Sequence, residues 1–305
     1  MNQFFKKVII SLLNFFRLRN PFFYIKKKFR RSVYLLSNLK DKNEFLHRLI
    51  ETGAVNYNKS VDGDIIDKWI YSYGLDINNI NPSDGNLAFP FFNEDLFKML
   101  KNSNFSNLLD EYFYKLHGCF PVLQQIPYIV ITYPNIDQTD FDPTKHNFPA
   151  NWHTDYQSEF TVHIPFINID SLSTHTLYSV GTHTSIFNAP KDNKNITNIF
   201  KSFGQKTDAI MLDVDGWHSG KLDGTNPRIM LQLKYTKGND LLTYPTEEIP
   251  KKQEMQIFRT RDNLKNYDKI RRCLLNDMSY IKNLDLKDKR FNIIKDNIKF
   301  YDHYI

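Results

Sequence analysis

Two short motifs place histidine and carboxylate side chains where they could bind one metal ion. The segment 152–155 reads Trp-His-Thr-Asp, and on an extended segment the side chains of His153 and Asp155 lie on the same face. A second Trp-His pair brings His218, 63 residues after Asp155. Two imidazoles and one carboxylate on one side of a metal form the facial arrangement of non-haem Fe(II), with further coordination positions left open. The spacing therefore predicts an iron site made of His153, Asp155 and His218.

A fixed cation follows this motif at a useful distance. Arg228 comes ten residues after His218, on the next expected strand, where it can point at the same cavity. A planar guanidinium can bind a carboxylate through two charge-assisted hydrogen bonds, which favours Arg over Lys for that task. Two plainer interpretations stay open: the His-x-Asp pair is a strand start whose Asp caps a turn, and Arg228 forms a surface ion pair with Asp213 or Asp223.

Four stretches between Pro127 and Tyr235 carry a resemblance to a known family. They are 151–155, 161–170, 180–183 and 215–231. In order, spacing and flanking residues they resemble the phytanoyl-CoA dioxygenase-like Fe(II)/2-oxoglutarate oxygenases. The stretch 180–183 looks like that family's Pro-Gly-Ser-His turn, with Val180 in place of Pro. Outside this core no resemblance is usable.

The resemblance implies an enzyme with Fe(II) as cofactor and 2-oxoglutarate and O2 as cosubstrates. His153, Asp155 and His218 match the family's metal ligands, and Arg228 matches the residue that pairs with the distal carboxylate of 2-oxoglutarate. The expected reaction oxidises a small organic molecule and releases succinate and CO2. The iron and the cosubstrates carry this chemistry, while the protein orients them and excludes water.

The resemblance also bears on the outcome of the reaction. Relatives that halogenate carry a small residue in place of the metal-binding carboxylate, so Asp155 favours hydroxylation or a related oxidation over halogenation. Thr132 and Gln232 are further candidate contacts to the cosubstrate. Two other functions stay open: a Zn or Mn enzyme on the same barrel, and a non-catalytic, membrane-associated binding protein with a relict site. The sequence does not select a substrate or an oligomeric state.

The surrounding pattern predicts an α+β fold. Strand-like runs occur at 128–133, 160–166, 174–180, 208–213 and 228–235. Many short strands separated by turn signals favour a double-stranded β-helix, the jelly-roll or cupin-like core. Apolar residues at helical spacing fill 41–118; the clearest stripe is Leu108, Leu109, Tyr112, Phe113 and Leu116, closed by Gly118. The polar loop 134–149 is either a lid over the site or an insertion.

These patterns suggest one oxygenase domain behind a distinct N-terminal segment. The domain is expected to span 41–305, with a helical buttress at 41–120, a jelly-roll core at 121–240 and a C-terminal helical extension at 241–305. The segment 1–40 is basic and apolar. His163, His175 and His183 are expected to be hydrogen-bonded structural residues rather than extra ligands.

The charge is unevenly distributed along the chain. The net charge is +6, yet the first 40 residues hold ten basic residues and no acidic one, which leaves 30 basic and 34 acidic residues beyond them. The body is thus mildly acidic, and the whole-chain charge gives no reason to expect nucleic-acid binding. Cys119 and Cys273 lie far apart, which fits a reducing, cytoplasmic setting.

The first 31 residues combine nine basic residues with apolar pairs at helical spacing. A basic amphipathic helix at the anionic inner face of a membrane fits this pattern, because the apolar run is far shorter than the roughly 20 residues that span a bilayer. Two alternatives remain: an ordinary helix docked on the body, and an export signal. On the membrane hypothesis, deleting residues 1–31 should abolish liposome binding and leave turnover of a soluble substrate intact.

Overall fold

The computed structural model describes residues 21–37, 43–75, 87–123, 127–134, 152–155, 160–185, 198–221 and 224–237. The helices are α2 (Pro21–Ser37), α3 (Glu44–Thr52), α4 (Gly63–Tyr73), α5 (Glu94–Asn102), α6 (Asn104–His117) and the short 3-10 helix η4 (Thr182–Thr184). The strands are β1 (Ala54–Tyr57), β2 (Leu87–Pro90), β3 (Pro121–Leu123), β4 (Tyr128–Thr132), β5 (Phe160–Pro165), β6 (His175–Ser179), β7 (Ile199–Lys201), β8 (Ala209–Asp213), β9 (His218–Lys221) and β10 (Arg228–Lys237).

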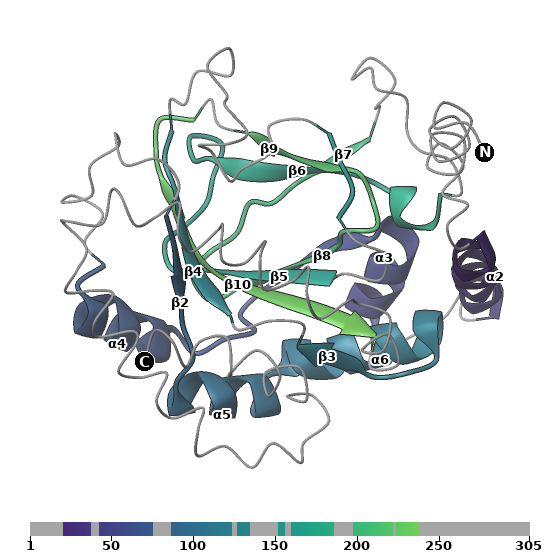
Figure 1. Ribbon diagram of the computed structural model, residues 1–305, viewed down its shortest axis with the longest axis horizontal. Coiled ribbons are helices and arrows are strands. Elements are labelled where there is room, and N and C mark those ends of the chain that lie inside the picture. Colours follow the sequence, from purple (N-terminus) through teal and green to yellow (C-terminus); the bar gives the residue numbers. More distant parts are fainter. Residues whose placement is uncertain are drawn as a thin grey trace, which may run out of the picture.

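The strands form two antiparallel sheets. The larger sheet has the order β1-β8-β5-β10-β4-β2, with β3 also paired to β10, and the smaller has the order β7-β6-β9. Figure 1 shows the smaller sheet above one face of the larger sheet, while α3, α5 and α6 lie on the other side. This arrangement of antiparallel sheets and helices agrees with the predicted α+β class. The finer expectation of a double-stranded β-helix stays a prediction.

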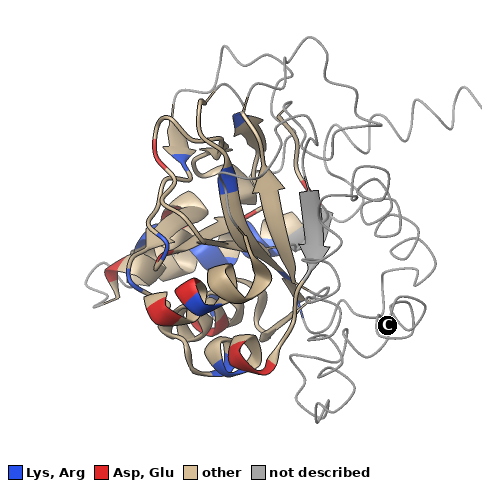
Figure 2. Ribbon diagram, turned by 90° about the vertical axis from the view of Figure 1, so that its left-hand side faces the viewer, with Lys and Arg blue, Asp and Glu red and all other residues tan. Residues whose placement is uncertain are grey.

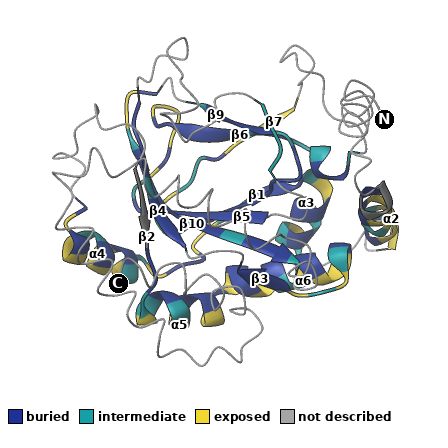
Figure 3. Ribbon diagram, viewed as in Figure 1, coloured by how far each residue is buried: buried dark blue, intermediate teal, exposed yellow. Residues whose placement is uncertain are grey.

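The main core lies between the helices and the larger sheet. All five residues of the predicted stripe on α6 are buried there, and the Tyr112 ring packs against Phe160 of β5 at 5.1 Å between centroids. Val162 and Ile164 of β5 point into the same core, so alternation directs His163 toward the smaller sheet. The helical layer thus fixes which residues of the larger sheet face the inter-sheet side, and Figure 3 shows the strands of this sheet coloured mostly as buried.

Helix ends follow the sequence signals. The Asn43 side chain caps α3 by accepting a hydrogen bond from the backbone N–H of Leu46 at 3.1 Å. α6 ends, as predicted, at Gly118, whose φ of 75° lies in the left-handed region that favours glycine.

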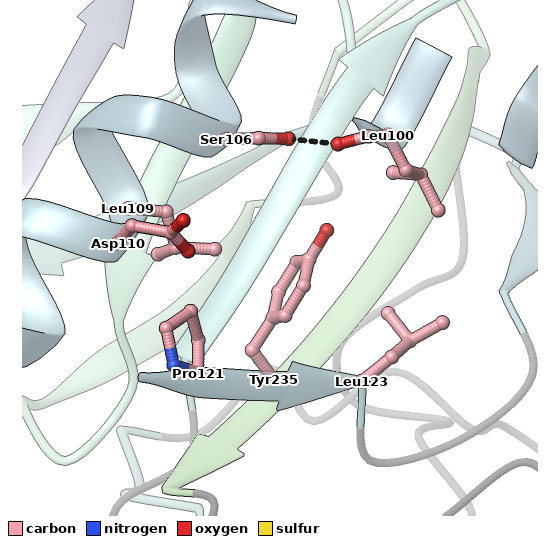
Figure 4. Close-up of a pocket in the computed structure, with 7 residues that line it drawn as sticks. All are labelled: Leu100, Ser106, Leu109, Asp110, Pro121, Leu123 and Tyr235. Atoms are coloured by element: carbon pink, nitrogen blue, oxygen red, sulfur yellow. Dashed lines mark hydrogen bonds between the residues drawn. The ribbon is translucent and has the colours of Figure 1, made fainter. Parts of the chain in front are cut away.

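A small cavity lies on the helical side of β10, where α5 and α6 meet β3 (Figure 4). Its volume of about 20 Å³ has room for about one water molecule. Tyr235 lines it, and the Ser106 hydroxyl beside it donates to the Leu100 carbonyl at 2.5 Å. Because alternation directs Tyr235 away from its neighbour Lys234, this cavity is separate from the polar face of β10.

The predicted strands are found at nearly their predicted positions, and the short strands β1, β2, β3, β7 and β9 add to them. Several segments with predictions lie outside the described residues: the first 20 residues of the basic N-terminal segment, nearly all of the loop 134–149, and the C-terminal extension 241–305.

Candidate metal centre

A two-residue bridge places the two predicted histidine ligands side by side. His153 donates its backbone N–H to the His218 carbonyl at 3.0 Å, and His218 returns a hydrogen bond to the His153 carbonyl at 2.9 Å. Residues paired in this way project their side chains to the same side of the ladder. The two imidazole rings are accordingly 4.2 Å apart between centroids.

Asp155 completes the cluster. Its backbone N–H donates to the Val214 carbonyl at 3.1 Å, which fixes the segment beside the chain that leads to His218. Its Oδ1 lies 3.6 Å from His153 Nε2 and 3.7 Å from His218 Nε2. The three ligand atoms all lie within 4.8 Å of one another. The structure therefore brings together the three residues that the motif spacing predicted.

The donor set fits a divalent transition metal. Nitrogen and oxygen donors about 2.0–2.2 Å from a common ion lie roughly 3.0–3.4 Å from each other. The carboxylate–imidazole distances of 3.6 and 3.7 Å exceed that range only slightly, so a small side-chain rotation would close the site. Two imidazoles and one carboxylate suit Fe(II), and also Zn or Mn, better than a hard ion such as Ca²⁺.

The backbone sets the tautomer of His218. Its Nδ1 lies 3.0 Å from the Gly216 carbonyl, which can only accept, so Nδ1 carries the proton and Nε2 presents its lone pair to the cluster. Burial lowers the pKa of His218 to about 4, against the opposing effect of the Asp155 carboxylate. The ring is thus neutral at physiological pH, the form that binds a metal.

Lys234 holds the far side of Asp155. Its Nζ lies 3.5 Å from Oδ2, which leaves Oδ1 facing the two imidazoles. Burial alone would raise the pKa of Asp155, but Lys234, followed by His218 and His153, lowers it to about 2. The sequence analysis missed Lys234, although it shares with Gln232 and Arg228 the inward-facing alternate positions of β10.

The turn before His218 is tightly packed. Tyr178 is fully buried, and its hydroxyl donates to the Asp213 carbonyl at 2.8 Å. The same hydroxyl lies so near Gly216 that any Cβ at that position would clash with the Tyr178 ring. The backbone N–H of Trp217 donates to the Thr182 hydroxyl at 2.9 Å. These contacts fix where β9 starts and hence where His218 points.

A second charged group lies behind this turn. Lys27 of α2 is buried, with its Nζ 2.7 Å from Asp213 Oδ2 and 2.6 Å from Asp215 Oδ2. The Tyr112 hydroxyl also donates to Asp213. Burial by itself would lower the pKa of Lys27, but the two carboxylates raise it overall. We call Lys27, Tyr112, Asp213 and Asp215 the rear cluster.

Arg228 spans the two sheets. Its Nη1 donates to the Thr176 hydroxyl of β6 at 3.0 Å, and its Nη2 lies 3.4 Å from the Thr132 hydroxyl of β4. The residue is 0% exposed, which excludes the surface ion pair left open above, and burial lowers its pKa to about 9. Thr132 was a predicted contact; Thr176 was not, because its place depends on how the sheets face each other.

His163 and Gln232 lie on the same face of the larger sheet as Arg228 and Lys234. They are opposite each other on β5 and β10, with 3.5 Å between His163 Nε2 and Gln232 Nε2. The pKa of His163 is lowered well below its usual value by burial and then by the charges of Arg228, His218 and Lys234, while Asp155 raises it. Arg228 contacts Thr176 of β6, and two residues further along β6 Tyr178 lies opposite His218 of β9, so Arg228 and His218 both lie beside β6.

His175 and His183 are hydrogen-bonded structural residues, as predicted. His175 Nδ1 lies 2.8 Å from the Ser173 carbonyl, and His183 Nε2 lies 3.2 Å from the Ile50 carbonyl. Both rings are buried structural groups. His163 lies 3.5 Å from the Gln232 side chain, but its buried Nδ1 has no hydrogen-bond partner among the described residues, so it fits the predicted structural role only in part.

Searches with protein-family models and against curated protein sequences find no match. Among solved structures, the chain is similar to the non-heme alpha ketoglutarate dependent epimerase SnoN from nogalamycin biosynthesis, with 10% identity and a TM-score of 0.41 over 64% of this chain and 82% of that one. It is also similar to HygX from Streptomyces hygroscopicus with nickel and 2-oxoglutarate bound, with 11% identity and a TM-score of 0.43 over 64% and 87% of the two chains. A third is EctD from S. alaskensis with 2-oxoglutarate and 5-hydroxyectoine, with 11% identity and a TM-score of 0.44 over 66% and 78%. Likenesses at this level assign no chemistry to this chain.

Proposed function

We propose that this protein is an Fe(II)- and 2-oxoglutarate-dependent dioxygenase that hydroxylates a small organic molecule and releases succinate and CO2. The observation that carries the proposal is the convergence of His153, Asp155 and His218, together with the buried cation Arg228, which contacts the strand that pairs with His218. The resemblance of the segments around these residues to phytanoyl-CoA dioxygenase-like enzymes supports the same class.

His153, Asp155 and His218 would hold the metal through Nε2, Oδ1 and Nε2. Fe(II), when bound there with 2-oxoglutarate and O2, supplies the oxidative decarboxylation that is coupled to substrate hydroxylation. The protein's share is to keep His218 neutral, to keep Asp155 ionised, and to aim both at one point. The Gly216 carbonyl and Lys234 perform these tasks from outside the ligand set.

Arg228 would bind the distal carboxylate of 2-oxoglutarate. The Thr132 and Thr176 hydroxyls hold the guanidinium in place from two different strands, so its orientation is fixed before a ligand arrives. An anion bound beside it would offset the cost of burying the cation, which is visible in the lowered pKa. Thr132 would be within reach of the same carboxylate. Gln232, four residues after Arg228 on the same face of β10, would face the ligand as well.

The two competing functions make different demands on Arg228. A hydrolytic Zn or Mn enzyme needs the three ligands but no buried guanidinium dedicated to a second carboxylate. A relict binding protein needs neither ligand geometry nor a neutral His218. The intact cluster together with a buried Arg228 favours the oxygenase.

The decisive experiment measures 2-oxoglutarate binding to Arg228→Ala under anaerobic conditions, with Fe(II) loaded. Charged hydrogen bonds contribute about 1.5–3 kcal/mol each, so affinity should fall by at least about 10- to 100-fold. Arg228→Lys, which keeps the charge without the two-pronged geometry, should lose less. Pyruvate, which lacks the distal carboxylate, should bind equally to the wild type and both variants.

Two further measurements make the result interpretable. Fe(II) affinity should be the same in the wild type and both variants, which shows that the cluster is intact, and thermal melting should show that each variant is folded. Unchanged 2-oxoglutarate affinity in a folded, iron-loaded Arg228→Ala protein would remove Arg228 from cosubstrate binding. Absence of succinate formation by the wild type across a metabolite pool, despite bound Fe(II), would favour the other two functions.

A further inference from the structure

The helix α2 has an exposed apolar face. Ile25, Phe29, Val33 and Leu36 are 51%, 67%, 46% and 77% exposed. They are four of the nine large apolar side chains that are exposed in the described part of the chain. Their spacing of four, four and three residues places them along one side of a helix. We call these four residues the α2 apolar face; Figure 3 shows exposed positions on this helix, which lies at the edge of the molecule.

The opposite side of the same helix is docked on the body. Tyr24, Lys27 and Tyr34 are buried, and Lys27 belongs to the rear cluster. The Arg31 guanidinium donates to the Ile50 carbonyl at 3.0 Å and to the Glu51 carbonyl at 2.7 Å, which caps the end of α3. The α2 apolar face is therefore held outward by a rigidly attached helix.

Positive charge flanks this face. Lys26 and Lys28 are both exposed, and at about 100° per residue they lie on the two sides of the apolar strip. Residues 21–37 contain five basic side chains and no acidic one. The preceding 20 residues add four more basic residues and again no acid. An apolar strip edged by lysines complements an anionic, amphiphilic surface.

Two other described helices, α4 and α5, lack this pattern. α5 is exposed at Glu94 and Lys98, which form an ion pair at 2.7 Å, and Lys68 of α4 pairs with Asp95 at 2.6 Å. Figure 2, which faces α4 and α5, shows both signs of charge on these helices. The exposed surfaces of α4 and α5 thus carry both signs of charge, whereas the charged residues of α2 are all basic.

We propose that α2 docks this protein on an anionic lipid bilayer, with the helix axis in the plane of the surface and the α2 apolar face among the acyl chains. No helix in the described ranges is long and apolar enough to cross a membrane. Seventeen residues at 1.5 Å per residue give a helix of about 25 Å, enough to place all four apolar side chains in one interfacial layer. Because Lys27 ties α2 to the turn before His218, docking also fixes the orientation of the metal centre toward the bilayer.

Because one face of α2 is docked on the body, deletion of residues 1–31 would also remove contacts with the body. On the membrane hypothesis stated for the sequence, deletion of residues 1–31 was expected to leave turnover of a soluble substrate intact. Lys27 and Arg31 lie within that stretch and contact the body, so the deletion would leave Asp213 and Asp215 without their lysine. Point substitutions on the outer face are the appropriate test.

The test is flotation of the full chain with vesicles of phosphatidylcholine, with and without phosphatidylglycerol. Phe29→Ser/Leu36→Ser removes apolar contact, and Lys26→Glu/Lys28→Glu reverses the flanking charge. Tyr71→Ser/Tyr114→Ser and Lys98→Glu/Lys101→Glu are matched controls, because Tyr71 and Tyr114 are 90% and 59% exposed and the two lysines lie on the exposed face of α5.

The wild type should bind the anionic vesicles and not the neutral ones. The apolar double variant should lose affinity by at least about tenfold, as expected from two large side chains that no longer enter the bilayer. Each charge removed from a lysine near an anionic surface should weaken binding about fivefold, so the reversal variant should lose at least about 25-fold, and added salt should weaken the wild type. Both control variants should bind like the wild type.

Melting temperature and metal affinity, measured for each variant, show whether the fold and the metal centre are intact. Equal binding by all proteins, or binding to neutral vesicles alone, would overturn the proposal. So would a wild type that does not bind vesicles but forms dimers which Phe29→Ser/Leu36→Ser abolishes, because that result assigns the α2 apolar face to a second copy of the chain.

Discussion

Two groups of charged side chains flank the turn between β8 and β9, and they differ in access. In the rear cluster, the side chains of Lys27, Asp213 and Asp215 are 1%, 2% and 0% exposed, and the lysine lies 2.6–2.7 Å from both carboxylates. In the metal cluster, the side chains of His153, Asp155 and His218 are 28%, 24% and 11% exposed. The first group is closed to solvent, whereas the second can be reached.

The two groups also differ in how their hydrogen-bond donors and acceptors are arranged. In the rear cluster the donors Lys27 and Tyr112 are directed at the carboxylate oxygens, and one cation lies between two anions. In the metal cluster, three acceptor atoms converge on one point, and both His218 and Asp155 are held by groups outside it that leave those atoms free to coordinate. Alternating charge stabilises an attachment between elements; converging acceptors make a ligand site. Both groups take residues from the six-residue stretch 213–218.

The largest expected effect separates the two groups by metal affinity. His218→Ala removes a ligand atom, so Fe(II) or Co(II) affinity measured by anaerobic calorimetry should fall by more than about 100-fold. The control is His175→Ala, which removes another buried imidazole that contacts a backbone carbonyl but lies outside the cluster. Metal affinity in that control should stay within about twofold of the wild type. A His218→Ala protein with wild-type affinity would remove His218 from the ligand set.

The rear cluster should instead respond in stability. Lys27→Met leaves two carboxylates buried without their cation, and breaking a buried pair costs about 3–5 kcal/mol in the free energy of unfolding. Urea denaturation measures this. Adding Asp213→Asn and Asp215→Asn should restore part of the loss, because no uncompensated charge remains. A Lys27→Met protein of wild-type stability but without metal binding would reverse the assignment of the two groups.

A smaller effect tests Lys234, whose charge pairs with the metal-cluster carboxylate of Asp155. Lys234→Met should raise the pKa of Asp155 from about 2, because Lys234 is the main charge that lowers it. A lowered carboxylate pKa contributes stability that is present above about pH 4 and is lost as the pH falls toward 2. The variant should therefore lose about 1 kcal/mol of apo-protein stability at pH 6, and less at pH 3.

The matched control for this change is Lys68→Met. Lys68 is also paired with a carboxylate, but its side chain is 63% exposed, so its removal should change stability by no more than about 0.5 kcal/mol at either pH. If Lys234→Met and Lys68→Met behaved alike, the contact between Lys234 and Asp155 would be an ordinary surface pair.

The residues of the metal cluster could be predicted from the sequence because the patterns that mark them lie in two short stretches, 152–155 and 217–218. Alternation along an extended segment is enough to put His153 and Asp155 on one face, and the run before His218 is strongly strand-like. The stripe on α6 and its end at Gly118 follow from helical spacing and from the conformational freedom of glycine. These elements therefore match their predicted positions closely.

Other residues could not be predicted because their partners are set by packing. Lys27 and Asp215 are 188 residues apart, and nothing in either neighbourhood of the sequence indicates the other. Thr176 meets Arg228 only because the two sheets face each other, and β9, with the sequence His-Ser-Gly-Lys, has no apolar alternation to reveal a strand. The N-terminal pattern left a surface helix, a docked helix and an export signal open; residues 1–20 lie outside the described part, and α2 has a docked face and an exposed one.

The contact of Arg228 with both sheets has a kinetic consequence. Its guanidinium is held by Thr132 in the larger sheet and by Thr176 in the smaller one, so the position of this cation depends on both sheets. A carboxylate bound to Arg228, as proposed above, should therefore dissociate faster from a variant in which the contact between the two sheets is loosened.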